Sequence, residues 1–133
     1  MVAGLGMLGC GKESRPVADQ WNAICRDAAR ERIANKLVTA TDFRRFVDSG
    51  HRTLKRLRGV ARDSELDARQ REALSAFAAQ RTLERRLLAE TQRRALVEVL
   101  LDFRKPADAL DARVRRTFKA AGARQCARYP YLR

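Results

Sequence analysis

The chain has 133 residues, of which 45% are apolar, and a formal net charge of +13 at pH 7. This length predicts one domain that can bury a core without requiring a disulfide or a metal ion for stability. No apolar run reaches the roughly 20 residues that a membrane-spanning helix needs. The excess of Arg and Lys favours anionic partners, unless it only reflects codon usage that fills exposed helix positions with Arg.

The first nine residues form an uncharged apolar run that leads directly into Cys10. The segment Met7-Leu8-Gly9-Cys10 resembles the end of a bacterial lipoprotein signal peptide, in which cleavage leaves the cysteine as the lipid-modified first residue. By this resemblance, residues 1–9 are a remnant of the signal peptide, Cys10 is a lipid anchor and residues 10–15 are a tether. The usual basic start of such a peptide is missing, so either the true start lies upstream of Met1 or the match is a coincidence.

The same glycines satisfy two phosphate-binding patterns, G-x-G-x-x-G from Gly4 and G-x-x-x-x-G-K from Gly6. Both patterns bind phosphate only between a strand and a helix, and no segment of this chain has the pattern of a strand. We therefore expect neither a nucleotide site nor a cofactor.

Residues 16–37 predict the first amphipathic helix. Trp21, Ile24, Cys25 and Ala28 recur at three-and-four spacing, and the stripe continues through Arg32 and Ile33. Trp21 is expected to be a core anchor, and Cys25 faces the core or its edge.

Residues 40–58 predict the second helix, because Thr39 and Asp42 have the spacing of a capping box and Gly59 is placed to end the helix. Its buried face is expected to contain Phe43, Phe46, Val47, Leu54 and Leu57. The opposite face carries the densest basic run of the chain, which is either a solvated surface or an anion-contact surface: Arg44, Arg45, Arg52, Lys55, Arg56 and Arg58. The single histidine, His51, has no second ligand at metal spacing, so no metal site and no catalytic role is expected for it.

Residues 65–103 predict a third helix that starts at a capping box of Ser64 and Asp67. This element is either a single long helix or one that is kinked or broken near 80–94, where charges are densest. Pro106 separates it from a last helix, 107–121, which Gly122 is placed to cap. Residues 127–133 are expected to be a flexible tail. The predicted fold is therefore all-α, an antiparallel bundle of about four helices in a single domain, 16–126.

The chain has three cysteines, an odd number for a protein outside the cytoplasm, but a lipidated Cys10 would leave an even pair. Cys25 lies on the first helix and Cys126 follows the last one, so antiparallel packing of these helices predicts a disulfide between them. The alternative is two buried thiols in a reducing cytosol.

The ends of the chain resemble small secreted or lipid-anchored helical proteins of high-GC Gram-positive bacteria. The resemblance rests on Cys10-Gly11, on Trp21 with the Ile-Cys-x-x-Ala segment from Ile24 to Ala28, and on the Gly-x-x-x-Cys ending from Gly122 to Cys126. It implies an exported helical bundle of unknown molecular function, with no catalytic residues to transfer.

These observations predict a non-catalytic protein with a binding or structural role in the cell envelope, held on the outer face of the membrane through Cys10. Its expected partners are the membrane itself and anionic lipid or wall polymer, with no small-molecule substrate. The alternative is a cytosolic basic helical protein that binds nucleic acid, although zinc-finger spacing, an aromatic stacking platform and a clear recognition-helix unit are absent. Scattered carboxylates and the lack of a ligand or nucleophile cluster argue against an enzyme.

Overall fold

The computed structural model describes residues 15–33, 37 and 39–129, and every regular element among them is helical. The predicted all-α fold is therefore confirmed for this part of the chain. The predicted signal remnant 1–9, the anchor Cys10, the tether up to residue 14 and the last four residues, 130–133, lie outside the described residues.

The described residues form six helices, four long ones of 17 to 23 residues and two short ones. The prediction of about four helices matches the long elements but missed the two short ones. In chain order the helices are α2 (Val17–Ile33), α3 (Ala40–Arg62), α4 (Ala68–Glu90), α5 (Leu96–Asp102), α6 (Arg104–Ala120) and α7 (Arg124–Ala127).

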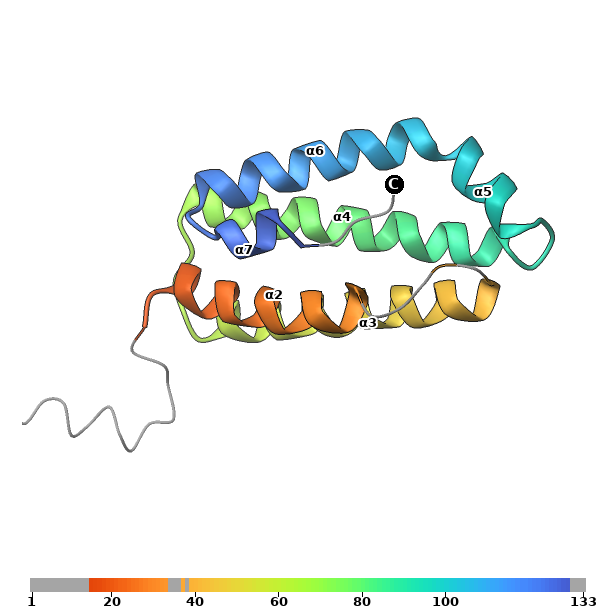
Figure 1. Cartoon of the computed structure of the whole chain (residues 1–133). Helices are drawn as coiled ribbons and strands as arrows, with labels where there is room; N and C mark the ends of the chain where they lie inside the picture. The colour runs from red at the N-terminus through yellow and green to blue at the C-terminus, as the bar shows by residue number, and fades with distance from the viewer. Residues whose placement is uncertain (1–14, 34–36, 38, 130–133) are drawn as a thin grey trace, which may run out of the picture.

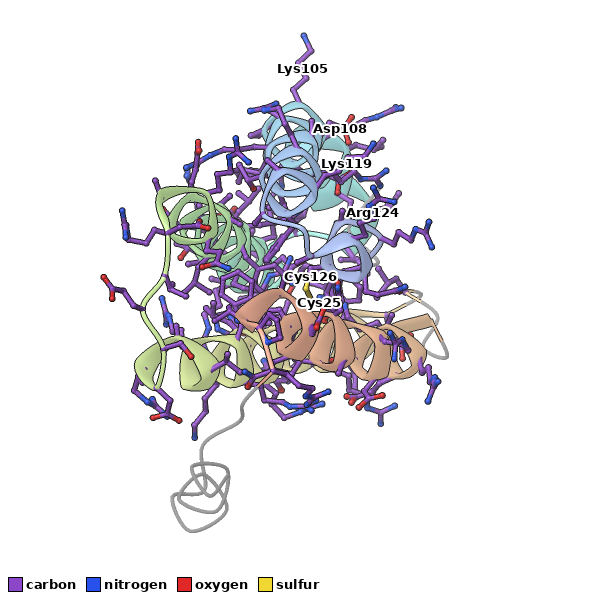
Figure 2. The ribbon with its side chains drawn as sticks, turned by 90° about the vertical axis from the view of Figure 1, so that its left-hand side faces the viewer. Cys25, Lys105, Asp108, Lys119, Arg124 and Cys126 are labelled. Carbon is purple, nitrogen blue, oxygen red and sulfur yellow. A yellow bond between two sulfur atoms is a disulfide. The ribbon has the colours of Figure 1, made fainter. Side chains whose placement is uncertain are left out.

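Consecutive long helices run in opposite directions and lie side by side (Figure 1). Helix α2 packs on α3, α3 on α4 and α4 on α6, while the short α7 packs against both α6 and α2. Figure 2, a view along the bundle, shows α7 between these two helices. The last helical turn of the chain therefore closes the side of the bundle between α2 and α6.

The ends of α2 and α3 differ from the predicted ones at two places. Leu37, the predicted end of the first helix, is not helical. The predicted capping box of α3 is confirmed, because the Thr39 hydroxyl accepts the amide hydrogen of Asp42 at 3.1 Å and the Asp42 carboxylate accepts that of Thr39 at 3.0 Å. The predicted stop at Gly59 is wrong: α3 continues to Arg62, and Gly59 lacks the positive φ of a left-handed cap.

The predicted helix 65–103 is two helices. Its capping box lies one turn later than predicted, because Asp67 is itself the cap and accepts the amide hydrogen of Gln70 at 2.8 Å. Helix α4 passes intact through most of the charged segment and ends at Glu90, so the break falls at the end of the predicted window. Pro106 lies in the first turn of α6, where a missing amide hydrogen has no cost, and α6 starts at Arg104 instead of residue 107.

The C-terminal segment is ordered further than predicted. Gly122 has a φ of 81° and ends α6 in the left-handed conformation, as expected. The predicted flexible tail 127–133 is wrong for its described part, because Tyr129 is only 1% exposed. Its hydroxyl lies 3.2 Å from that of Thr53, and its ring packs edge-on against Phe77.

Two apolar clusters share the interior. The larger one surrounds Trp21, which is fully buried, donates its indole N–H to the Leu57 carbonyl at 3.1 Å and packs edge-on against Phe118. Trp21 is thus confirmed as a core anchor. The smaller cluster, at the α5 end, consists of Phe43, Phe46, Val47, Leu87 and Val99.

Candidate functional site

The two cysteines of the predicted pair lie together in the core between α2 and α7 (Figure 2). The Cα atoms of Cys25 and Cys126 are 5.0 Å apart, the sulfur atoms are at disulfide distance, and both residues are fully buried. Packing of α7 against α2 produces this geometry, which falls in the range that disulfides require. The pairing predicted from the sequence is therefore sterically available across 101 residues of chain.

Next to the larger apolar cluster lies a buried ionic cluster that the sequence interpretation missed: Arg32 on α2 with Arg81 and Glu84 on α4. One carboxylate oxygen of Glu84, Oε2, accepts from Arg32 Nη2 at 3.3 Å and from Arg81 Nη2 at 3.0 Å, and all three side chains are at most 1% exposed. Two cations therefore share one anion in the interior. The predicted apolar stripe already included Arg32 at a buried phase, and this position was the available signal.

Aromatic rings cover the two guanidinium groups of this cluster. The Cζ atom of Arg32 lies 3.4 Å from the ring centroid of Phe46 and 4.6 Å from that of Tyr129, and Arg81 lies 4.4 Å from Phe77. Such cation–π contacts stabilise a desolvated cation by up to about 2 kcal/mol. Since the cluster is closed to solvent and its charged groups form ion pairs with one another, we interpret its role as structural.

The predicted basic face of α3 is exposed, but it does not form one surface. Arg52, Lys55 and Arg58 line a shallow depression of about 480 Å³ between α3 and α4. We call this the α3–α4 depression; its other charged or polar lining residues are His51, Arg62 and Arg85.

The remaining residues of the predicted basic face lie apart from the α3–α4 depression. Arg44 lines a neighbouring hollow that also contains Asp48. Arg45 and Arg56 are exposed and line neither hollow. Arg52 also forms an exposed ion pair with Glu31 of α2, so part of the basic face is neutralised within the protein.

His51 borders the α3–α4 depression. Its Nε2 atom lies 2.6 Å from Arg85 Nε, which donates to it, and 3.3 Å from the carbonyl oxygen of Arg81. Burial and then the neighbouring Arg85 cation lower the pKa of His51 below its usual 6.5. The imidazole of His51 thus lies against the guanidinium group of Arg85.

A second basic hollow, which the sequence interpretation missed, lies between α6 and α7. It has a volume of about 780 Å³, and its lining includes Ala112 and Ala127. In Figure 2, Lys119 of α6 and Arg124 of α7 lie on the same flank of the molecule. We call it the α6–α7 groove, and its cations are Arg115, Arg116, Lys119, Arg124 and Arg128.

One cation of the α6–α7 groove is paired within α6. Arg115 donates to the largely buried carboxylate of Asp111, with Arg115 Nη2 at 3.1 Å from Asp111 Oδ2. Burial raises the pKa of Asp111, and the hydrogen bond from Arg115 opposes that shift. The other four cations of the groove form no ion pair with any residue that the structure describes.

An apolar hollow of about 370 Å³ lies at the junction of α5 and α6. Val97 and Leu101 of α5 border it and are each 63% exposed. Arg104 and Asp108 also line it, with Arg104 Nε at 3.8 Å from Asp108 Oδ2. Figure 2 shows Lys105 nearby, pointing away from the bundle.

Over residues 15–33, 37 and 39–129, no cluster of His, Cys, Asp or Glu side chains is arranged to hold a metal ion. The helices in these ranges also include none with the length and apolar character of a bilayer-crossing segment. Comparison of the chain with known protein families, with curated proteins and with solved structures finds no significant match.

Proposed function

We propose that this protein is an exported, non-catalytic binding domain of the cell envelope, built as a four-helix bundle and tethered to the outer face of the membrane by a lipid on Cys10. The observation that carries the proposal is the position of Cys25 and Cys126 at disulfide distance in the core. Disulfides persist in oxidising compartments and are rare in the cytosol. Pairing of these two leaves Cys10 as the third cysteine, which agrees with its expected role as the anchor.

A binding role is supported by the distribution of charge. The net charge is +13, and two hollows, the α3–α4 depression and the α6–α7 groove, are lined mainly by Arg and Lys. Near an anionic surface each such residue contributes about 1 kcal/mol of attraction. Anionic lipid or an anionic wall polymer is therefore the partner that we propose.

A non-catalytic role is supported by the partners of the titratable side chains. Glu84 is shared by two buried arginines, Asp111 is paired with Arg115, and the His51 imidazole accepts a hydrogen bond from Arg85. Glu84 and Asp111 are buried, and His51 is partly buried. Each is engaged with a cation, as expected for charge balance within a fold.

The experiment that tests export and anchoring is fractionation of native-host cells that produce the wild-type protein or a Cys10→Ser variant. We expect the wild type in the membrane fraction, with a diacylglycerol-bearing N-terminal peptide in mass spectra, and the variant uncleaved or released. A Cys10 residue that carries no lipid in the native host would contradict the proposal, as would wild-type protein found only in the cytosol.

The α3–α4 depression favours a second candidate function, a cytosolic protein that binds nucleic acid. Arg52, Lys55 and Arg58 follow one another along the exposed face of α3, with the cation of Arg85 on the facing helix, as a phosphate-contacting surface would require. Titration of duplex DNA at increasing salt distinguishes the two functions. Strong binding with a steep salt dependence, combined with free thiols at Cys25 and Cys126 in cells, would support this candidate over export.

A further inference from the structure

We propose that the α6–α7 groove is the binding site of the protein and that its ligand is a linear chain of phosphate groups without bases, such as a phosphodiester wall polymer. This inference rests on the binding role proposed above, but it does not depend on the anchor at Cys10. It replaces a general attraction to anions with one site and one chemical class of ligand.

The groove concentrates positive charge, most of which forms no ion pair within the described part of the chain. Arg124 and Arg128 are four residues apart on one side, and Arg116 and Lys119 are three residues apart on the other. Like charges at these spacings repel each other by a few tenths of a kcal/mol per pair. A bound polyanion would remove this repulsion, and it would meet four cations that have no carboxylate partner in the described part of the chain.

The two sides of the groove are held in place by the core. Helix α7 has only four residues, so it cannot be stable by itself. Cys126 fixes it to α2 through Cys25. Asn22 of α2 adds a second link, because its side-chain oxygen accepts the amide hydrogen of Gln125 at 2.9 Å. The disulfide therefore positions the α7 cations opposite those of α6, and the site is preorganised only while the bond is intact.

The chemistry of the groove fits phosphate. Four of its five cations are arginines, and the planar guanidinium group binds phosphate oxygens in a bidentate manner. Along α6 the groove extends from Ala112 to Lys119, which corresponds to about 10 Å at 1.5 Å per residue. A groove of this length and a volume of about 780 Å³ accommodates several consecutive phosphate groups instead of one.

The same lining argues against the other polyanions. Single-stranded nucleic acid is usually bound through aromatic side chains on which bases stack, whereas none of the described residues that line the groove is aromatic. A flat membrane surface cannot follow a hollow between two helices. A flexible phosphate chain can enter the hollow and contact cations of both α6 and α7.

Isothermal titration calorimetry of the oxidised protein tests the inference, with inorganic polyphosphate and poly(glycerol phosphate) as probes and single-stranded DNA and anionic vesicles as competitors. The groove variant removes four charges: Arg116→Gln, Lys119→Gln, Arg124→Gln and Arg128→Gln. The matched control removes four exposed charges of the α3–α4 depression: Arg52→Gln, Lys55→Gln, Arg58→Gln and Arg62→Gln. Urea unfolding of both variants checks that they fold like the wild type, as their exposed positions predict.

We expect the groove variant to lose at least about tenfold in affinity for polyphosphate, and its slope of log affinity against log salt to fall by about 3, since each phosphate contact of a single strand contributes about 0.7. The control variant should lose much less. Reduction of the disulfide in the wild type should also weaken binding, because α7 then loses its fixed position.

Equal losses in the two variants would overturn the inference, while the proposed binding role would remain, because attraction would then depend on net charge alone. Tighter binding of single-stranded DNA or of vesicles than of either phosphate polymer would also overturn it and assign the groove to that ligand. If the wild-type protein binds none of these anions at low salt, both the inference and the proposed binding role fail.

Discussion

Replacement of Glu84 with Gln should cost far more stability than the same replacement on the surface. Glu84 is an anion shared by two buried guanidinium groups, with its Oε2 atom 3.3 Å from Arg32 Nη2 and 3.0 Å from Arg81 Nη2. Gln has nearly the same shape but no charge, so the variant leaves two like charges facing each other in the interior. Removal of one partner from a buried ion pair typically costs about 3 to 5 kcal/mol, a large part of a total stability of about 5 to 15 kcal/mol.

Urea unfolding measures this effect, with Glu31→Gln as the control. Glu31 pairs with Arg52 on the surface, where both side chains are at least half exposed, and such pairs contribute at most about 1 kcal/mol. With a urea m-value of about 1 to 3 kcal/mol per M, the midpoint of the Glu84 variant should fall by more than about 1 M. A loss as small as that of the control would refute the assignment of Glu84 as a buried counterion.

Four further measurements follow from the packing. Gly50→Ala should destabilise the protein by about 1 to 3 kcal/mol, because the new Cβ would lie 3.0 Å from atoms of both buried arginines. Gly59→Ala should instead stabilise α3 by about 0.5 to 1 kcal/mol, because its Cβ would meet its nearest neighbour at 3.6 Å. Urea unfolding compares the two variants, and a change in the free energy of unfolding with the same sign in both would contradict the packing of Gly50. The bond between Cys25 and Cys126 closes a loop of 101 residues, so its reduction should lower the free energy of unfolding by about 4 to 5 kcal/mol. An unchanged urea midpoint with reductant would show that no bond had formed. The pKa of His51 is lowered in the folded protein, so the unfolded chain binds the proton more readily. The contribution of His51 to the free energy of unfolding should therefore be fully present above pH 6.5 and should fall as the pH decreases from 6.5 toward the folded-state pKa. A His51→Gln variant should show a shallower fall in thermal midpoint over that range, and an identical pH profile would contradict the assignment.

The apolar pattern was sufficient to predict the long helices. Phe43, Phe46, Val47, Leu54 and Leu57 all lie in the core of α3 as expected, because period-3.6 burial is visible in the sequence itself. Helix ends were less accurate. The cap of α4 moved by one turn because two acceptor residues, Ser64 and Asp67, both precede the helix, and only the packing of α4 selects between them.

The buried charges and the short elements required tertiary information. Arg and Glu are usually exposed, so a sequence-based interpretation does not place Arg81 and Glu84 in the core, although both lie in phase with the buried Phe77 and Leu87. Helix α7 is too short to show periodicity. For the same reason the α6–α7 groove was not predicted, since it forms only where the chain turns back at Gly122 and brings two separate groups of cations together.

The redox state of Cys25 and Cys126 in the native host tests the central claim most directly. Cells are quenched in acid, free thiols are alkylated before reduction, and the peptides that contain these residues are analysed by mass spectrometry. An exported, disulfide-closed domain predicts that the two peptides are joined and that both cysteines are protected from the first alkylation. Alkylation of both cysteines before reduction would contradict the account and would place the protein in a reducing compartment.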